Sequence, residues 1–337
     1  MHTGNNLLAI DNNLIRASYK LTVNEMRLLL VALAQMPKNE PVNPNQAYYI
    51  TKNDFVKLGV EPKNVAREIR EACNDLLGRV VVINTPVGEL GVHWVLNILN
   101  FKTEIFESLK KKYPDAQNDK NFLQQLKMHN LLDSLPVVTK SDDNIIARIV
   151  FHPNMIPFIS DLKEQFTKFN INDFFTFGSI YSFRIYLMMM QFKETGFCKI
   201  SLNDLRKSLE LQDKYDATKD FKKRVIDTAA KEINEKTPYK LTYDLLKTGR
   251  KFTHLELHFE SKRKPKKEEI VENFKSLTDK QISFFAKKLA YDSVFSGQYA
   301  EVGEEYEDLE KRLMGKLADT DFVQKITSDL KRLGFKA

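Results

Sequence analysis

Apolar and polar residues alternate along this chain in a pattern that predicts the same series of elements twice. The octapeptide at residues 50–57, ITKNDFVK, recurs at residues 200–207 as ISLNDLRK. Each copy follows an apolar segment at helical spacing, residues 24–35 and 182–191 respectively. An internal repeat of this kind indicates two related structural units.

The segments after each octapeptide predict a further helix and a pair of strands. Residues 62–77 and 218–234 are basic and amphipathic, which is typical of surface helices. Alternating apolar residues then predict strand pairs at 80–83 with 92–97 and at 239–245 with 252–259. A helix-turn-helix followed by a β-hairpin is a winged helix. We therefore predict an α+β fold with tandem winged-helix domains.

Each octapeptide also predicts where its helix begins. Thr51 and Ser201 stand at the N-cap position, where a hydroxyl accepts a hydrogen bond from a free backbone N–H. Asp54 and Asp204 fall in the first turn, where a carboxylate meets the positive end of the helix dipole.

The predicted elements divide the chain into three parts. Residues 1–152 form the first winged-helix domain and 153–262 the second, and 263–337 form a linker with a small helical C-terminal extension. The extension is predicted from helical spacing at 279–291, 302–317 and 322–333.

The connecting segments carry predictions of their own. Residues 107–140 are long and polar, which predicts a mobile loop. A strand at 145–151 is expected to close the first domain, and helical spacing over 153–166 predicts a helix that joins the two domains. The basic, proline-containing run 262–267 predicts the linker.

Composition narrows the function classes only a little. The 337 residues include 52 Lys and Arg against 45 Asp and Glu, so the net charge of +7 is compatible with a nucleic-acid partner without establishing one. The apolar run 28–34 is too short to span a membrane, and the first residues lack a secretory pattern. We expect a cytoplasmic protein without a membrane partner, whose Cys73 and Cys198 are reduced thiols.

The clearest candidate chemistry is a basic cluster in the second unit. Phe221, Val225, Ala229 and Ile233 recur every four residues and form the expected inward face of the helix. Basic side chains early in a recognition helix suit the DNA major groove, and a glycine at a hairpin tip lets the backbone approach a phosphate. The candidate DNA-binding residues here are Lys219, Lys222, Lys223, Arg224 and Lys231 on the helix, with Arg250 and Lys251 beside Gly249 in the wing.

The corresponding helix of the first unit is more ambiguous. Lys63, Arg67 and Arg70 share one face and are candidate DNA contacts, but glutamates are interspersed among them. Two interpretations stay open: a face that contacts phosphates, and a helix covered with surface ion pairs.

The sequence contains no motif that indicates an enzyme activity. It contains no GxxxxGK loop, so we expect neither a nucleotide site nor a cofactor. His254, Glu256 and His258 alternate on a predicted strand and share a face on which a metal is conceivable, but an outward polar face of the wing explains them better. We therefore expect no catalytic residues and no metal site.

Several motifs, in family order, resemble the initiator Rep proteins of iteron-controlled bacterial plasmids. They are NLI at 13–15, ASY at 17–19, FHP at 151–153, SFRIYL at 182–187, DFKKRV at 220–225 and KTGRK at 247–251. The resemblance implies a replication initiator that binds direct repeats in the origin as a monomer and represses its own promoter as a dimer formed through the first domain. Double-stranded DNA is the implied partner, together with a host replication initiator and helicase.

The resemblance also implies residue roles. The family's main base-reading positions match Lys222, Lys223 and Arg224 on the helix and Arg250 in the wing. Lysine at two of these positions departs from the arginine that the family often has, and a lysine lacks the two-pronged geometry that recognises guanine. A winged-helix transcriptional regulator without an origin function is the main alternative, and an interaction scaffold with merely solvated helices is a second.

Overall fold

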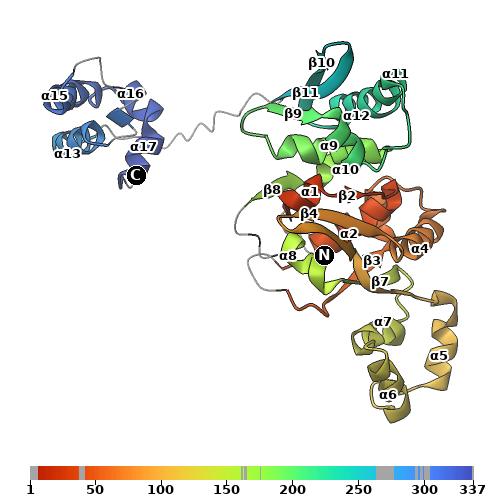
Figure 1. Cartoon of the computed structure of the whole chain (residues 1–337). Coiled ribbons are helices and arrows are strands. Elements are labelled where there is room, and N and C mark those ends of the chain that lie inside the picture. The colour runs from red at the N-terminus through yellow and green to blue at the C-terminus, as the bar shows by residue number, and fades with distance from the viewer. Residues whose placement is uncertain are drawn as a thin grey trace. The chain divides into compact units, whose positions relative to one another are not determined.

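The computed structural model describes residues 7–37, 42–160, 162, 165–174, 176–262, 277–292, 295–296, 299 and 304–335. The chain divides into two compact units, residues 1–262 and 263–337 (Figure 1). Both predicted winged helices lie in the first unit. Residues 263–267 of the predicted linker lie outside the described residues.

The first winged helix contains the elements that the repeat predicts. The Thr22 hydroxyl caps the apolar helix α2 and the Thr51 hydroxyl caps α3, each in a capping box with the acidic residue three positions later. The strand 145–151 is also confirmed. The elements of this part are β1 (Leu7–Asp11), α1 (Asn12–Arg16), β2 (Ser18–Tyr19), α2 (Val23–Ala34), β3 (Ala47–Thr51), α3 (Lys52–Lys57), α4 (Val65–Leu76), β4 (Val80–Thr85), β5 (Gly88–His93), β6 (Val95–Asn100) and β7 (Ile145–Phe151).

The strands β2 to β7 form two small antiparallel sheets, with the strand orders β2-β4-β5 and β3-β7-β6. The predicted strand 92–97 is wrong as a single element, because the chain leaves β5 at His93 and enters the other sheet as β6 at Val95. Trp94, between them, is 4% exposed and stands edge-on to Tyr19 with ring centroids 5.0 Å apart. Burial of the Trp94 ring fixes the backbone at the point where the chain passes from one sheet to the other.

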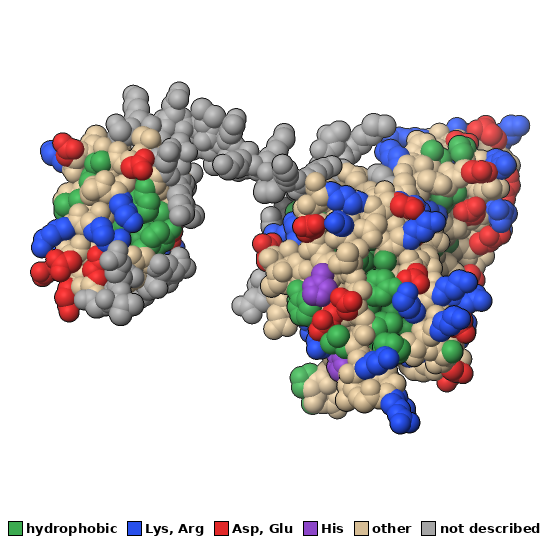
Figure 2. Space-filling view, turned by 90° about the horizontal axis from the view of Figure 1, so that it is seen from above, with side chains coloured by type: hydrophobic (Ala, Val, Ile, Leu, Met, Phe, Trp, Pro, Cys, Tyr) green, Lys and Arg blue, Asp and Glu red, His purple; other side chains and the backbone are tan. Residues whose placement is uncertain are grey.

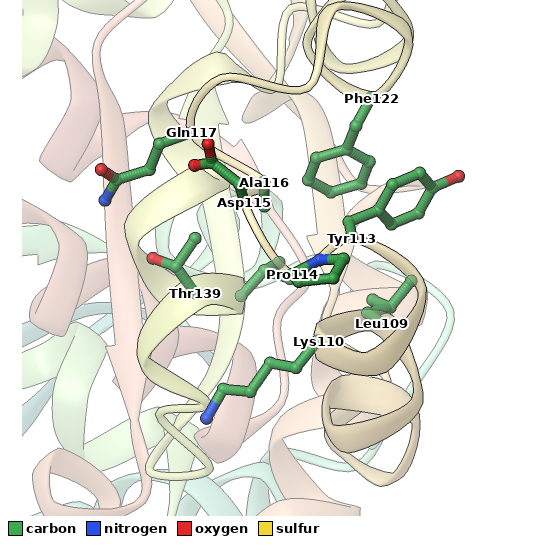
Figure 3. A pocket seen from close by; sticks show the side chains of 10 residues that line it. Leu109, Lys110, Tyr113, Pro114, Asp115, Ala116, Gln117, Phe122 and Thr139 are labelled. Carbon is green, nitrogen blue, oxygen red and sulfur yellow. The ribbon is translucent and has the colours of Figure 1, made fainter.

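The predicted mobile loop over 107–140 is also wrong, because this segment folds into short helices that project from β6 and β7 (Figure 1). Phe106, Phe122 and Val137 are buried, and the Tyr113 and Phe122 rings stack 4.5 Å apart. A cavity of about 340 Å³ remains beside these rings (Figure 3). The helical elements are η1 (Thr103–Ile105), α5 (Phe106–Lys112), α6 (Lys120–Met128), η2 (Leu132–Ser134) and α7 (Leu135–Lys140).

One side chain anchors this helical insertion to the sheet. Arg148 of β7 is 4% exposed, and its Nε donates to Asp133 Oδ2 at 2.8 Å while Nη2 donates to the Asn130 carbonyl at 3.1 Å. Each insertion helix has nine residues or fewer. Helices this short show little periodicity in sequence, and they are stable only through such tertiary contacts.

The single helix predicted over 153–166 is wrong in its length. Only η3 (Pro153–Met155) and α8 (Ile156–Ile159) form, and Phe166–Asn170 is a strand, β8. A continuous helix would place Pro157 in its interior, where it lacks an N–H to donate and its ring clashes with the preceding turn. β8 pairs antiparallel with β1, with Ala9 opposite Lys168. Residues 161, 163 and 164 lie outside the described residues.

The second winged helix repeats the same order and is capped as predicted, since the Asp204 N–H donates to the Ser201 hydroxyl at 3.0 Å. Its three-stranded sheet has the order β10-β11-β9. The elements are η4 (Ile171–Phe174), α9 (Ile180–Met190), β9 (Phe197–Ser201), α10 (Leu202–Ser208), α11 (Thr218–Phe221), a π-helical turn η5 (Lys222–Ile226), α12 (Asp227–Lys236), β10 (Tyr239–Thr248) and β11 (Lys251–Ser261).

A single hydrophobic core runs through both winged helices, and a buried arginine lies within it. Arg184 of α9 is 2% exposed, and its guanidinium lies 3.5 Å from the centre of the Tyr19 ring. Its Nη2 donates to the Ala17 carbonyl of the first winged helix at 2.7 Å and to the Ser208 carbonyl of the second at 3.0 Å. Burial lowers the pKa of Arg184 to about 9, so the group remains charged at neutral pH.

The C-terminal unit has a hydrophobic core of its own, which includes Phe285, Leu309 and Ile326. The helix predicted at 322–333 is divided in two, and Val302, the predicted start of another, lies outside the described residues. Within the described residues, no helix is both long and apolar enough to cross a membrane. The described helices are α13 (Asp279–Ala290), α15 (Tyr306–Lys316), α16 (Thr320–Lys325) and α17 (Thr327–Arg332).

We predict that Arg184→Met destabilises the larger unit by about 2–5 kcal/mol, because methionine leaves the buried Ala17 and Ser208 carbonyls without a donor. Urea denaturation followed by circular dichroism measures the effect. The exposed variant Arg67→Met should change the unfolding free energy by less than about 0.5 kcal/mol. Equal unfolding midpoints for the two variants would contradict a structural role for the buried guanidinium.

Candidate nucleic-acid interface

The helix in the recognition position of the second winged helix is built as α11, the π-helical turn and α12. Phe221, Val225, Ala229 and Ile233 are all fully buried, which confirms the predicted inward face. Side chains four residues apart in an α-helix drift around the axis by about 40° at each step. The wider π-helical turn offsets part of this drift, so all four residues remain on the core.

Four of the predicted basic residues on this helix are exposed: Lys219, Lys223, Arg224 and Lys231. The Arg224 guanidinium lies 5.8 Å from the centre of the Tyr215 ring, which limits its motion without covering it. Figure 1 shows α11 and α12 beside the β10–β11 hairpin, so the helix and the wing belong to one surface.

Lys222 differs from its neighbours because it is paired within the protein. Its Nζ donates to Asp227 Oδ1 at 3.0 Å and lies 5.3 Å from the centre of the Tyr243 ring on β10. The Tyr243 hydroxyl donates to Asp227 as well. These three side chains join the recognition helix to the wing.

The pKa directions agree with this pairing. Burial by itself would raise the pKa of Asp227, but hydrogen bonds from Tyr243 and Lys222 outweigh it and lower that pKa. Hydrogen bonds to Tyr243 and Asp227 raise the pKa of Lys222. Both groups therefore stay charged across the neutral range, and their attraction persists there.

The wing offers an open, basic tip. Gly249 has φ +63°, and a Cβ built there would meet nothing within 4 Å. This backbone conformation favours glycine, and the open space leaves the backbone accessible. Arg250 and Lys251 are exposed beside it. An open groove of about 460 Å³ between the start of the helix and the wing is lined by Lys219, Lys222, Tyr243 and Phe252, among others.

Sequence reasoning missed the role of Arg206 at the end of α10. Its guanidinium donates to three carbonyls in the connection to the recognition helix, those of Leu211 (3.3 Å), Lys214 (2.8 Å) and Tyr215 (2.7 Å). It also stacks over Phe221 at 4.2 Å. The sequence signal was an arginine inside the repeated octapeptide, where the first copy has valine.

The candidate residues of the first winged helix do not form one open basic face. Lys63 precedes α4 and lies 3.2 Å from Glu61, and Arg67 pairs with Glu71 at 3.2 Å. Arg70 donates to the Phe101 carbonyl at 3.2 Å. The structure favours the interpretation of a helix covered with surface ion pairs, and Figure 2 shows charges of both signs side by side on the larger unit.

The histidine-containing face of β11 has structural partners. Glu256 pairs with Lys199 of the adjacent strand β9 at 3.1 Å and lies 3.9 Å from His258. Across the part of the chain that the structure describes, no group of three or more His, Cys, Asp or Glu side chains is arranged to hold a metal ion.

The fold and this surface define a tandem winged-helix protein of the DNA-binding kind. The chain belongs to the initiator replication protein family: the family's "Initiator Replication protein, WH1" model matches residues 7–190, and its "Initiator Rep protein, WH2" model matches residues 201–259. This match confirms the resemblance to initiator Rep proteins and the predicted tandem winged-helix fold.

Individual relatives agree with the family assignment. A replication initiation protein of Escherichia coli is 24% identical over 329 residues, which cover 95% of this chain and 87% of the relative. An uncharacterised 27.6 kDa E. coli protein is 32% identical over 108 residues, 31% of this chain and 44% of that protein. The Pi initiator protein, crystallised with iteron DNA, has the same fold with a TM-score of 0.56 and 18% identity, covering 76% of this chain and 97% of that one.

We predict that Arg206→Lys costs about 1–3 kcal/mol of stability, because one ammonium group cannot reach three carbonyls that a planar guanidinium bridges. Hydrogen exchange should accelerate in the connection 209–217, and thermal denaturation should show the loss. The matched variant Arg67→Lys, on an exposed ion-paired helix, should change neither. Unaltered exchange in Arg206→Lys would show that the three carbonyl contacts do not hold the connection.

Proposed function

We propose that this protein initiates plasmid replication by binding directly repeated sequences (iterons) at the origin in the bacterial cytoplasm. The observation that carries this proposal is the exposed basic helix and wing of the second winged helix, found in a chain that belongs to the initiator family. The Pi initiator protein, which has the same fold, was crystallised with iteron DNA, which supports the choice of ligand.

Within this proposal, residues 153–262 bind DNA specifically, with Lys223 and Arg224 directed to base edges in the major groove. Lys222 is a positioning residue, because its ammonium group is held by Asp227 and Tyr243. The other candidate cations of the recognition helix and the wing contact phosphates: Lys219, Lys231, Arg250 and Lys251.

Within the same proposal, residues 1–152 make auxiliary contacts with DNA. Lys63, Arg67 and Arg70 each have a partner within the protein, so binding to a phosphate exchanges one interaction for another. We therefore assign them a small share of the affinity.

Replacing Lys223 and Arg224 together by Ala should reduce affinity for the cognate repeat far more than affinity for random DNA, since each lost base contact typically costs about 1–3 kcal/mol. Gel-shift titrations at one fixed salt concentration measure both affinities. Lys57→Ala, an exposed lysine on α3, is the matched control and should leave both almost unchanged. Equal losses on both DNAs would assign the two side chains to phosphate contacts alone.

The proposal extends to a dimer that represses the protein's own promoter, with the monomer binding the repeats. The strands of the first domain are candidates for the dimer contact. β7 lies between β3 and β6, and β4 lies between β2 and β5, so neither has an open edge. β6 is at the edge of its sheet and exposes Leu96 by 46%, which makes it the proposed dimer strand.

Leu96→Lys should shift the protein toward monomer, because a two-fold axis brings two like charges together. Sedimentation velocity of the full chain without DNA measures the shift. Val87→Lys, at the 98% exposed tip of the β4–β5 hairpin, is the matched control and should sediment like the natural protein. A dimer population that Leu96→Lys leaves unchanged would place the interface elsewhere.

A winged-helix transcriptional regulator is the alternative function. An array of direct repeats of about 20 bp, two helical turns, at an origin beside the coding sequence would favour the initiator, and two winged helices on one duplex face require that spacing. Contacts of the C-terminal extension, residues 263–337, with a host replication initiator or helicase stay a prediction.

A further inference from the structure

A cavity of about 360 Å³ lies between the two winged helices. Its walls come from α1, β2 and β4 of the first and from α9, β9 and α10 of the second, which Figure 1 shows close together. Neither the recognition helix nor the tip of the wing lines it. The cavity is therefore separate from the proposed DNA-binding surface.

The walls are largely apolar. Val82, Met188, Phe192 and Ile200 line the cavity, and the buried Cys198 adds a small apolar surface. Cavities of roughly 300–1,000 Å³ with apolar walls and a few polar groups are typical of small-molecule sites.

Arg16 supplies the charge that such a site needs. Its Nε donates to Gln191 Oε1 at 3.0 Å, and among the described residues no carboxylate lies within ion-pair distance of its guanidinium. By contrast, Lys199 pairs with Glu256 at 3.1 Å and Lys207 pairs with Glu89 at 2.6 Å. The cavity thus has one cation without a counter-charge and two that are already neutralised.

Two further groups refine the ligand class. The Gln191 side-chain nitrogen, also at the wall, is buried without a hydrogen-bond acceptor in the described part of the chain. Asp204 lines the cavity too, and its carboxylate accepts a hydrogen bond from the Ser201 hydroxyl at 2.6 Å at the start of α10. One free cation beside one carboxylate favours a ligand with a single negative charge over a dianion.

Burial raises the pKa of the Cys198 thiol to about 11, and the charge of Arg16 opposes that shift. The field of the guanidinium therefore reaches the apolar wall, where a bound anion would feel it.

We propose that this cavity binds a small amphipathic monocarboxylate. The carboxylate accepts hydrogen bonds from the Arg16 guanidinium, whose planar fork matches two carboxylate oxygens. The apolar part of the molecule packs among Val82, Met188 and Ile200. Because both winged helices form the walls, a bound ligand stabilises the arrangement of the two that is seen here.

Isothermal titration calorimetry of the full chain with sodium octanoate tests the site without DNA. We expect saturable binding at one site, with octan-1-ol of the same chain length at least about tenfold weaker because it lacks the charge, and no binding of inorganic phosphate. Equal affinity for octanoate and octan-1-ol, binding of phosphate in place of octanoate, or no octanoate binding at millimolar concentration would overturn the proposal.

Two variants locate the binding. Arg16→Gln should weaken octanoate binding by about tenfold without changing the affinity for octan-1-ol. Val82→Phe, which narrows the cavity, should weaken the binding of both ligands. Lys57→Gln removes an exposed cation that does not line the cavity, and it should change the affinity for neither ligand. Circular dichroism melting confirms that the variants fold. Unchanged octanoate affinity in both Arg16→Gln and Val82→Phe would show that octanoate binds elsewhere and overturn the assignment.

Discussion

The buried guanidinium of Arg184 is the interaction on which the arrangement of the two winged helices depends. Moving a cation out of water costs several kcal/mol, and among the residues that the structure describes no carboxylate accepts a hydrogen bond from this guanidinium. Two carbonyls and the face of Tyr19 stabilise the charge in its place. Because Ala17 belongs to the first winged helix and Ser208 to the second, a shift of one against the other would leave the buried guanidinium and a buried carbonyl without their hydrogen bond. The relative placement of α4 and of the recognition helix α11–α12 follows from that constraint.

Arginines and lysines have two different tasks in this protein, and their partners decide which. Arg206 and Lys222 are directed inward to carbonyls or to a carboxylate, and they hold the turn and the wing against the recognition helix. Lys223 and Arg224, which adjoin Lys222 in sequence, remain exposed. A surface that reads DNA needs both, since exposed cations give specificity only when their backbone is held in place. Around helix α4 of the first winged helix this division is absent, because Lys63 and Arg67 are ion-paired on the surface.

The parts that sequence patterns missed are those held by contacts between distant residues. β1 pairs with β8 across more than half of the larger unit, and nothing local in Phe166–Asn170 distinguishes that strand from the end of a helix. The insertion helices are too short to show a clear period, and Arg148 and stacked aromatic rings stabilise them. The cavity beside Arg16 likewise exists only because α9 and α10 pack on β2 and β4.

Sequence patterns alone predict the repeated winged-helix order, the caps at Thr51 and Ser201, the inward face that begins at Phe221 and the basic positions of the recognition helix. These features follow from side-chain periodicity and from hydrogen bonds between residues three or four apart, so a short segment of sequence is enough to predict each of them. The three-dimensional fold was needed to show which basic residues are exposed, which strands have open edges and where the two winged helices meet. Those outcomes depend on partners such as Asp227 for Lys222 or Ala17 for Arg184, and sequence spacing alone does not specify a contact across the fold.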